Sequence, residues 1–187
     1  KHKKIYYWSP HINEKIATVK AVLNSIKSLK KYSKNYHVSI INSFGEWSSL
    51  KVDNEDIDFI DLTLAKKFNF RINITGFIKS RVAYLLIGLF SIKPLYNLLK
   101  KEKPDYLVVH LLTFIPFILL ILFNFKTKFI LRVSGYPKMN LFREILWKLA
   151  SKKIYKVFCP TKETMNSLGS KDIFEKNKLL VIEDPIV

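Results

Sequence analysis

Two apolar, strand-like runs separated by one apolar segment restrict the fold of this chain more than any other feature. The runs are residues 106–109 and 129–133, and residues 111–125 between them are apolar and long enough for a helix. Parallel strands need such a crossover, whereas antiparallel strands can be joined by a short turn. We therefore expect a parallel β–α–β unit in which residues 111–125 form a buried crossover helix.

Polar residues follow both runs at the point where each strand is expected to end. His110 follows the first run, and Arg132, Ser134 and Gly135 close the second. The carboxyl ends of parallel strands meet at one edge of a sheet, and ligands bind in the crevice there. We therefore expect His110 and the turn at residues 132–135 to face one cleft.

Strand-like and helix-like segments alternate along the chain. Strands are expected at residues 4–8, 36–42, 57–62, 106–109, 129–133, 155–159 and 178–182. Helices are expected at residues 14–32, 76–101, 111–125 and 139–153, followed by a short helix capped by Thr161. This order predicts an α/β fold, a Rossmann-like doubly wound parallel sheet of about seven strands with helices on both faces. A single domain, residues 1–187, accounts for every segment.

The two long helices have apolar residues at helical spacing, which predicts one apolar face on each. For residues 76–101 these are Ile78, Val82, Leu85, Leu86 and Leu89. For residues 139–153 they are Leu141, Phe142, Ile145, Leu146 and Leu149. Pro94 is expected to kink or restart the first of these helices, because proline removes a backbone hydrogen bond.

The chain is strongly basic, with a formal net charge of +17. Residues 162–187 hold four lysines and five acids, so the positive excess lies in residues 1–161. Such an excess favours a polyanionic partner: nucleic acid, anionic lipid or phosphate groups. On the predicted helix at residues 14–32 and just after it, four lysines line up on one side: Lys20, Lys27, Lys31 and Lys34. They form either a solvated face or a surface that faces an anionic membrane.

Several kinds of chemistry find no support in the sequence. The single cysteine, Cys159, excludes an internal disulfide and suits a reducing compartment. The histidines are too scattered to predict a metal site, and the usual dinucleotide, P-loop and hydrolase motifs are missing. The first residues lead directly into a strand without a signal-peptide pattern. Residues 111–125 are shorter than the ~20 residues that span a bilayer, so an interfacial membrane segment is the alternative to a buried helix.

Two residues of the predicted cleft have competing interpretations. His110 is either a group that exchanges or shares a proton near neutral pH, or a hydrogen-bonded histidine at the edge of the core. Arg132 lies in an apolar run and needs a partner for its guanidinium. That partner is either an anionic group of a ligand or an internal carboxylate, Asp105 or Glu144.

The second half of the chain resembles the N-terminal half of family 4 glycosyltransferases, which have the GT-B fold. The resemblance rests on residues 131–169 and 178–186, and on Asp105 followed five residues later by His110. Near the end of the chain, Asp184-Pro185-Ile186 is similar to the Asn-Pro-Ile-type motif that leads into the second domain of that family.

The resemblance implies two Rossmann-like domains with an active site between them. The first domain binds mainly the acceptor. The second holds most of the nucleotide-sugar site, including a Glu-x7-Glu motif. We therefore expect this chain to be the acceptor-binding part of a longer, retaining enzyme of the hexosyltransferase type, inactive without its C-terminal domain. The expected substrates are a nucleotide-sugar and a lipid-linked or glycan acceptor, without a cofactor or a required metal.

The expected setting is bacterial surface-polysaccharide synthesis, with the enzyme cytoplasmic and peripheral on the inner face of the plasma membrane. His110 is the expected catalytic residue. Residues expected to bind acceptor or substrate are Ser9, His11, Asn13, Arg132, Ser134, Gly135, Tyr136, Thr161 and Glu163. The competing hypotheses are a basic nucleic-acid-binding protein and a non-catalytic peripheral membrane module. Nucleic acid is the less favoured partner, because no RNA-recognition, helix-turn-helix or zinc-finger pattern is present.

Overall fold

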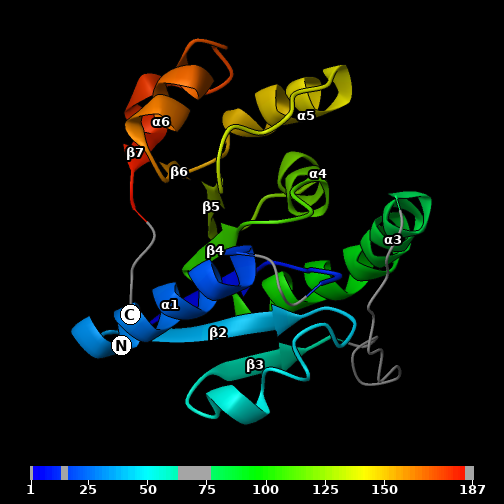
Figure 1. The fold of residues 1–187 in the computed structure, drawn as a ribbon, viewed down its shortest axis with the longest axis vertical. Coiled ribbons are helices and arrows are strands. Elements are labelled where there is room, and N and C mark those ends of the chain that lie inside the picture. The colour runs from blue at the N-terminus through cyan, green and yellow to red at the C-terminus, as the bar shows by residue number, and fades with distance from the viewer. Residues whose placement is uncertain (1, 14–16, 63–76, 184–187) are drawn as a thin grey trace.

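A computed structural model describes residues 2–13, 17–62 and 77–183 of the chain. Its centre is a seven-stranded parallel sheet in the order β3-β2-β1-β4-β5-β6-β7 (Figure 1). The strands are β1 (Lys3–Trp8), β2 (Tyr36–Asn42), β3 (Asp58–Asp61), β4 (Tyr106–Val109), β5 (Lys128–Arg132), β6 (Lys156–Cys159) and β7 (Leu179–Val181). The predicted doubly wound α/β fold is therefore confirmed, and each strand lies within a few residues of its expected position.

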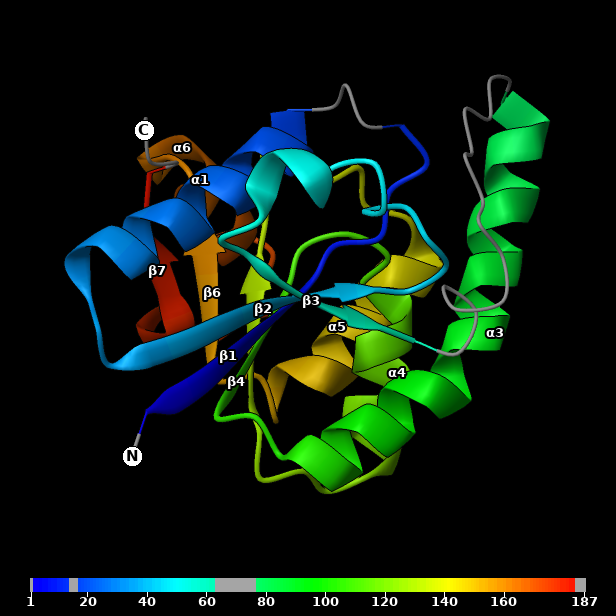
Figure 2. The same cartoon turned by 90° about the horizontal axis from the view of Figure 1, so that it is seen from below.

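Helices cover both faces of the sheet. On one face lies α1 (Ala17–Tyr32), as Figure 2 shows. The other face is covered by α3 (Phe77–Glu102), α4 (Phe114–Leu122), α5 (Leu141–Ser151) and α6 (Lys162–Gly169). Two short 3-10 helices, Val52–Asn54 and Lys176–Lys178, complete the described elements.

The core forms two layers, one on each side of the sheet. Side chains alternate between the two faces of a strand, so Leu107 and Val109 of β4 face the α3–α6 layer, whereas Val108 faces α1. The α1 layer also contains Val22 and Ile26, both fully buried. Burial on both faces explains why the strands are continuous apolar runs in the sequence.

Some helix boundaries differ from the expectation. Pro94 lies inside α3 without interrupting it, so the predicted restart is wrong. The crossover helix α4 is nine residues long, shorter than expected, because residues 110–113 form a loop before it. Three parts of the predictions lie outside the described residues: the start of the first helix at residues 14–16, the start of the second at residue 76, and the motif at residues 184–186.

The apolar faces predicted for α3 and α5 are mostly not the faces that pack on the sheet. On α3 the buried side chains are Ile87, Ser91, Leu95 and Leu99, and large exposed ones are Val82, Leu85, Leu86, Leu89 and Phe90. On α5 the buried side chains are Leu146, Trp147 and Ala150, and the large exposed apolar side chains are Leu141, Phe142, Ile145 and Leu149. Both helices have apolar residues on two sides, and periodicity alone cannot tell which side packs.

Gly88 allows α3 to pass close to α4. A Cβ atom at this position would clash with the ring of Phe114 and lie 3.3 Å from Cδ1 of Ile115. We expect Gly88→Val to lower the free energy of unfolding by roughly 1–3 kcal/mol, the usual cost of overpacking, as measured by urea denaturation. Gly169→Ala is the control, because its new Cβ would lie 3.6 Å from Leu179, an ordinary contact. Equal stability of the two variants would contradict the close approach of the helices.

Candidate functional site

A cavity of about 680 Å³ opens at the carboxyl ends of β4 and β5. Tyr84 of α3, Phe114 of α4 and Phe142 of α5 contribute to its wall, together with the turn after β5. Its lining is mainly apolar, and its polar groups include His110, Ser134 and Arg143. This is the edge of the sheet at which the sequence predicts a cleft.

His110 and Ser134 meet in this cavity. The distance between Nε2 of His110 and Oγ of Ser134 is 2.8 Å. His110 is nearly buried, with 6% of its surface exposed, whereas Ser134 is exposed. The backbone N–H of His110 donates to the carbonyl of Trp8, 2.9 Å away, which ties the end of β4 to β1. The predicted meeting of His110 with the turn after β5 is therefore seen directly.

The loop at residues 110–113 is held by two tryptophans. Nε1 of Trp8 donates to the carbonyl of Leu112 at 3.4 Å, and Nε1 of Trp147 donates to Oγ1 of Thr113 at 3.3 Å. Leu112 has a φ of 48°, a left-handed conformation that is uncommon for a bulky residue. Such backbone conformations are often found where a loop presents a functional group. Here the loop begins with His110.

Arg132 is among the residues that line the cavity, but its guanidinium turns to α1 on the other face of the sheet. Its Nη1 donates to Oγ of Ser25 on α1 at 2.6 Å, and that hydroxyl donates to the carbonyl of Ala21 at 2.7 Å. Burial raises the pKa of Tyr7 to about 12, and the positive charge of Arg132 opposes this shift. Asp105, one of the expected partners, lies before β4 and accepts a hydrogen bond from the backbone N–H of Lys4 at 2.8 Å.

Gly135 and Tyr136 line the cavity beside Ser134. Tyr136 is half exposed, and the space around the position of a Gly135 Cβ is open to at least 4 Å. A ligand in the cavity can therefore approach this turn closely. Both residues lie where the sequence predicts a binding turn.

The residues expected after β1 adjoin the cavity but are not among the described residues that line it: Ser9, His11 and Asn13. Ile12, in the same segment, belongs to an apolar cluster with Tyr84 and Leu112, which both line the cavity. Ser9 and His11 are buried, and the His11 ring packs edge-on against Trp47 with 4.6 Å between ring centres. Asn13 is exposed.

Thr161 and Glu163 begin α6 at the end of β6 and are likewise outside the described lining of the cavity. Thr161 is the predicted N-cap, and its Oγ1 accepts from the backbone N–H of Thr164 at 3.2 Å. Hydrogen bonds from its own backbone N–H and from Thr161 hold the pKa of Glu163 below its usual range. In the structure both residues cap the helix.

The four lysines predicted to face a membrane lie on the α1 side of the sheet. Lys20 and Lys31 of α1 are exposed, as is Lys34 in the turn after it, and Lys27 is partly buried. Because α1 covers the opposite face from α3, α4 and α5, these lysines lie across the sheet from the wall of the cavity that those helices form (Figure 2).

The contribution of α5 to the cavity was not predicted from the sequence. Asn140 caps this helix by accepting from the backbone N–H of Arg143 at 2.8 Å. Arg143 and Trp147 both line the cavity, and Nη1 of Arg143 donates to the carbonyl of Lys138 at 2.6 Å. Asparagine before an apolar, helical segment is a common N-cap signal. This signal could have been used to predict that the first turn of α5 lies at the edge of the cleft.

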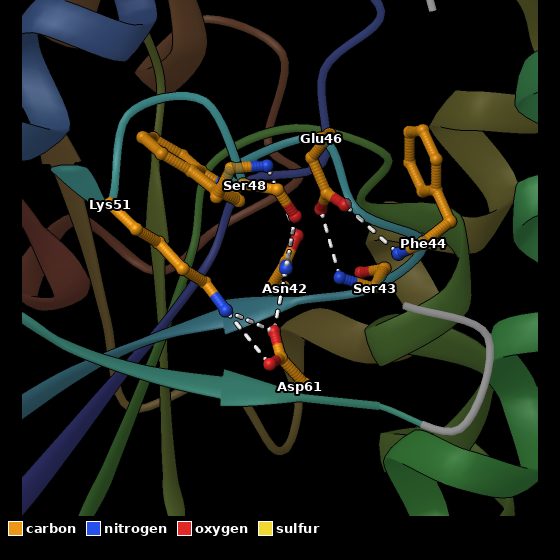
Figure 3. Close-up of polar contacts among 8 residues, drawn as sticks. Asn42, Ser43, Phe44, Glu46, Ser48, Lys51 and Asp61 are labelled. Atoms are coloured by element: carbon orange, nitrogen blue, oxygen red, sulfur yellow. Dashed lines mark hydrogen bonds and ion pairs between the residues drawn. The ribbon is translucent and has the colours of Figure 1, made fainter. Parts of the chain in front are cut away.

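A second polar group missed in the sequence follows β2 (Figure 3). The Glu46 carboxyl group is buried and accepts from the backbone N–H groups of Ser43 at 3.0 Å and Phe44 at 2.9 Å. Burial raises its pKa to about 7. Beside it, Nδ2 of Asn42 donates to Asp61 at 2.6 Å. These contacts fix the loop after β2, in which Gly45 has a φ of 105°.

Within residues 2–13, 17–62 and 77–183, no three His, Cys, Asp or Glu side chains are grouped so that they could hold a metal ion. Neither a protein-family model nor a curated protein matches the chain.

Solved structures do match it over almost its full length. A glycosyltransferase from Rickettsia africae matches with a TM-score of 0.64 and 16% identity, over 97% of this chain and 43% of that one. The lipopolysaccharide outer core galactosyltransferase WaaB matches with a TM-score of 0.64 and 9% identity, over 98% and 46%. The chain has the fold of one half of a GT-B enzyme.

UDP-GlcNAc 2-epimerases share this half-fold. The enzyme from Neisseria meningitidis, bound to UDP-GlcNAc, matches with a TM-score of 0.56 and 20% identity, over 95% of this chain and 44% of that one. The chain therefore spans less than half the length of each of these three GT-B-like structures. At these identities the likeness extends to the fold alone.

Proposed function

We propose that this chain is the acceptor-binding half of a retaining, family 4 type glycosyltransferase. The complete enzyme moves a sugar from a nucleotide-sugar to a lipid-linked or glycan acceptor during the synthesis of bacterial surface polysaccharide. The main support is the cavity at the carboxyl edge of a GT-B half-fold, where His110 and Ser134 lie 2.8 Å apart. Ligands of open α/β sheets bind at this edge.

The chemistry of the cavity suits an acceptor that combines polar and apolar parts. His110 and Ser134 offer hydrogen bonds to sugar or acceptor hydroxyls, and Arg143 offers a positive charge to a phosphate group. Phe114, Phe142 and Trp147 provide an apolar wall for a hydrocarbon chain. In the transfer, the bond from the anomeric carbon to the nucleotide diphosphate breaks and a bond to the acceptor oxygen forms. The acceptor proton passes to the departing diphosphate.

The nucleotide-sugar is a substrate, and its main contacts belong to a second Rossmann-like domain. We assign no cofactor and no required metal to this half. The proposed location is the inner face of the plasma membrane, with the enzyme held there peripherally.

Radiolabelled nucleotide-sugars and a membrane lipid extract provide the test. The complete gene product is expected to move label into the lipid-extractable or glycan fraction, whereas the 187-residue chain alone is expected to transfer none. Turnover of any nucleotide-sugar by this chain alone would contradict the proposed division between two domains. Conversion of UDP-GlcNAc without any acceptor would instead favour an epimerase, and tight, salt-sensitive binding to duplex DNA would favour a nucleic-acid-binding protein.

A further inference from the structure

The outer sides of α3 and α5 expose large apolar residues next to the cavity. On α3, the side chains of Leu85, Leu89 and Phe90 are 55%, 56% and 60% exposed. On α5, Leu141 and Phe142 are 76% and 65% exposed. Soluble proteins rarely expose apolar side chains in groups of this kind unless the surface binds a partner or a membrane. We call these two groups of residues, with Val82, Leu86, Ile145 and Leu149, the apolar rim.

The apolar rim continues into the cavity. Phe142 belongs to both, because it is largely exposed and also lines the cavity. Tyr84, directly before Leu85 in α3, also lines the cavity. An apolar chain lying on the rim can therefore reach the site that holds His110 beside Phe142 and Tyr84.

The charges around the rim are mainly positive. In α3 the basic residues are Lys79, Arg81, Lys93, Lys100 and Lys101, and the first acid is Glu102 at its last position. Around α5 lie Lys138, Arg143, Lys148 and Lys152, against the single acid Glu144. An apolar centre with basic flanks complements an anionic lipid surface, where apolar side chains enter the headgroup region and lysines contact lipid phosphates.

This surface fits a helix lying in the interface better than one crossing the bilayer. Residues Lys79–Glu102 are the one described segment that is long and apolar enough to span a membrane, with a mean hydropathy of 1.5. The C-terminal half of the helix, however, packs on the sheet: Leu95 is 0% exposed and Leu99 is 1% exposed. Only the outward side and the first turns of α3 are available to lipid.

We propose that the apolar rim of α3 and α5 lies in the headgroup region of an anionic bilayer, and that the acceptor enters the His110 cavity directly from that bilayer. The occupant is a lipid surface, and the acceptor is lipid-linked rather than a soluble glycan. The choice of acceptor rests on the proposed function, whereas the membrane contact does not. The lysines of α1 belong to a helix that covers the opposite face of the sheet from α3 and α5.

Site-specific labelling tests the orientation. Cys159 is buried, and burial raises the pKa of its thiol to about 11, so a single added cysteine can be labelled selectively. An environment-sensitive fluorophore on Leu89→Cys is expected to brighten and shift to the blue with vesicles of phosphatidylcholine and phosphatidylglycerol. The same fluorophore on Lys20→Cys of α1 is the matched control and should change little. Equal responses at the two positions would overturn the proposed orientation.

Vesicle co-sedimentation tests the contribution of the rim. Changing Leu85, Leu86, Leu89 and Phe90 together to serine should weaken binding to the same vesicles by at least about tenfold, because apolar burial drives interfacial binding. Changing Lys20, Lys27 and Lys31 to serine should weaken it far less. Circular dichroism checks that both variants stay folded.

Two results would overturn the inference. The first is unchanged vesicle binding by the serine variant of the rim. The second is no vesicle binding by the wild-type chain together with a dimer that the same four changes dissociate, since the rim would then be an interface between copies. Transfer to a soluble glycan by the complete gene product would leave the proposed function intact while excluding a lipid-linked acceptor.

Discussion

His110→Ala in the complete enzyme is expected to lower kcat by roughly 10²-fold or more, the usual effect of losing a positioned polar group at a reacting centre. His110 lines the cavity and lies 2.8 Å from Ser134. Under the proposed function its imidazole contacts the transferred sugar or the acceptor. The loop that carries it is tied to Trp8 and Trp147, which act on its position without entering the chemistry. The measurement is the rate of sugar transfer at saturating donor and acceptor.

A stability measurement separates this effect from unfolding. His110→Ala should lower the free energy of unfolding by roughly 1–3 kcal/mol, since the hydrogen bond to Ser134 and the packing of a buried ring are lost. Ser134→Ala is the matched variant, because it removes the other member of the same pair and should reduce kcat by a smaller factor. Normal turnover by His110→Ala, or a loss of activity fully explained by unfolding, would identify His110 as a structural residue.

The pH dependence of stability should contain a large contribution from Glu46. Its pKa is about 7 in the folded chain, against an ordinary value of 4.5, because the carboxyl group is buried. The folded state therefore binds more protons than the unfolded state between these two pH values. The stabilising contribution is complete below about pH 4.5 and is lost as the pH rises through about 7. The expected loss is about 3 kcal/mol.

Glu46→Gln removes this titration. Its free energy of unfolding in urea should change between about pH 5 and about pH 8 by about 3 kcal/mol less than that of the wild type. Glu55→Gln is the control, because Glu55 is an exposed acid between β2 and β3, as Glu46 is a buried one. Parallel pH profiles of wild type and variant would contradict the buried, raised-pKa carboxyl group.

The strands and their carboxyl edge could be predicted from the sequence because each strand is buried on both faces. Such strands are short apolar runs, and the polar residue that ends a run marks the edge of the sheet. His110 and Ser134 were placed together on this basis, and the structure brings them within hydrogen-bonding distance. The same reasoning located the cap at Thr161.

Other features depend on packing that a linear pattern does not contain. Arg132 and Ser134 are two residues apart, yet the Arg132 guanidinium turns to Ser25 on α1 while the Ser134 hydroxyl meets His110. Ser25, the partner of Arg132, lies 107 positions away from it in the sequence, so no local signal connects the two residues. The packed faces of α3 and α5 were also missed, because each helix is apolar on two sides. The raised pKa of Glu46 follows from burial, which sequence position does not give.

Binding of farnesyl diphosphate to the 187-residue chain tests the acceptor site most directly. Trp147 lines the cavity, whereas Trp8 and Trp47 are not among its described lining residues, so ligand entry should alter mainly the Trp147 emission. We expect a saturable change with farnesyl diphosphate that Trp147→Phe abolishes and Arg143→Ala weakens, and no such change with UDP. The absence of a saturable change, or an equal one in Trp147→Phe, would show that this cavity does not hold the acceptor.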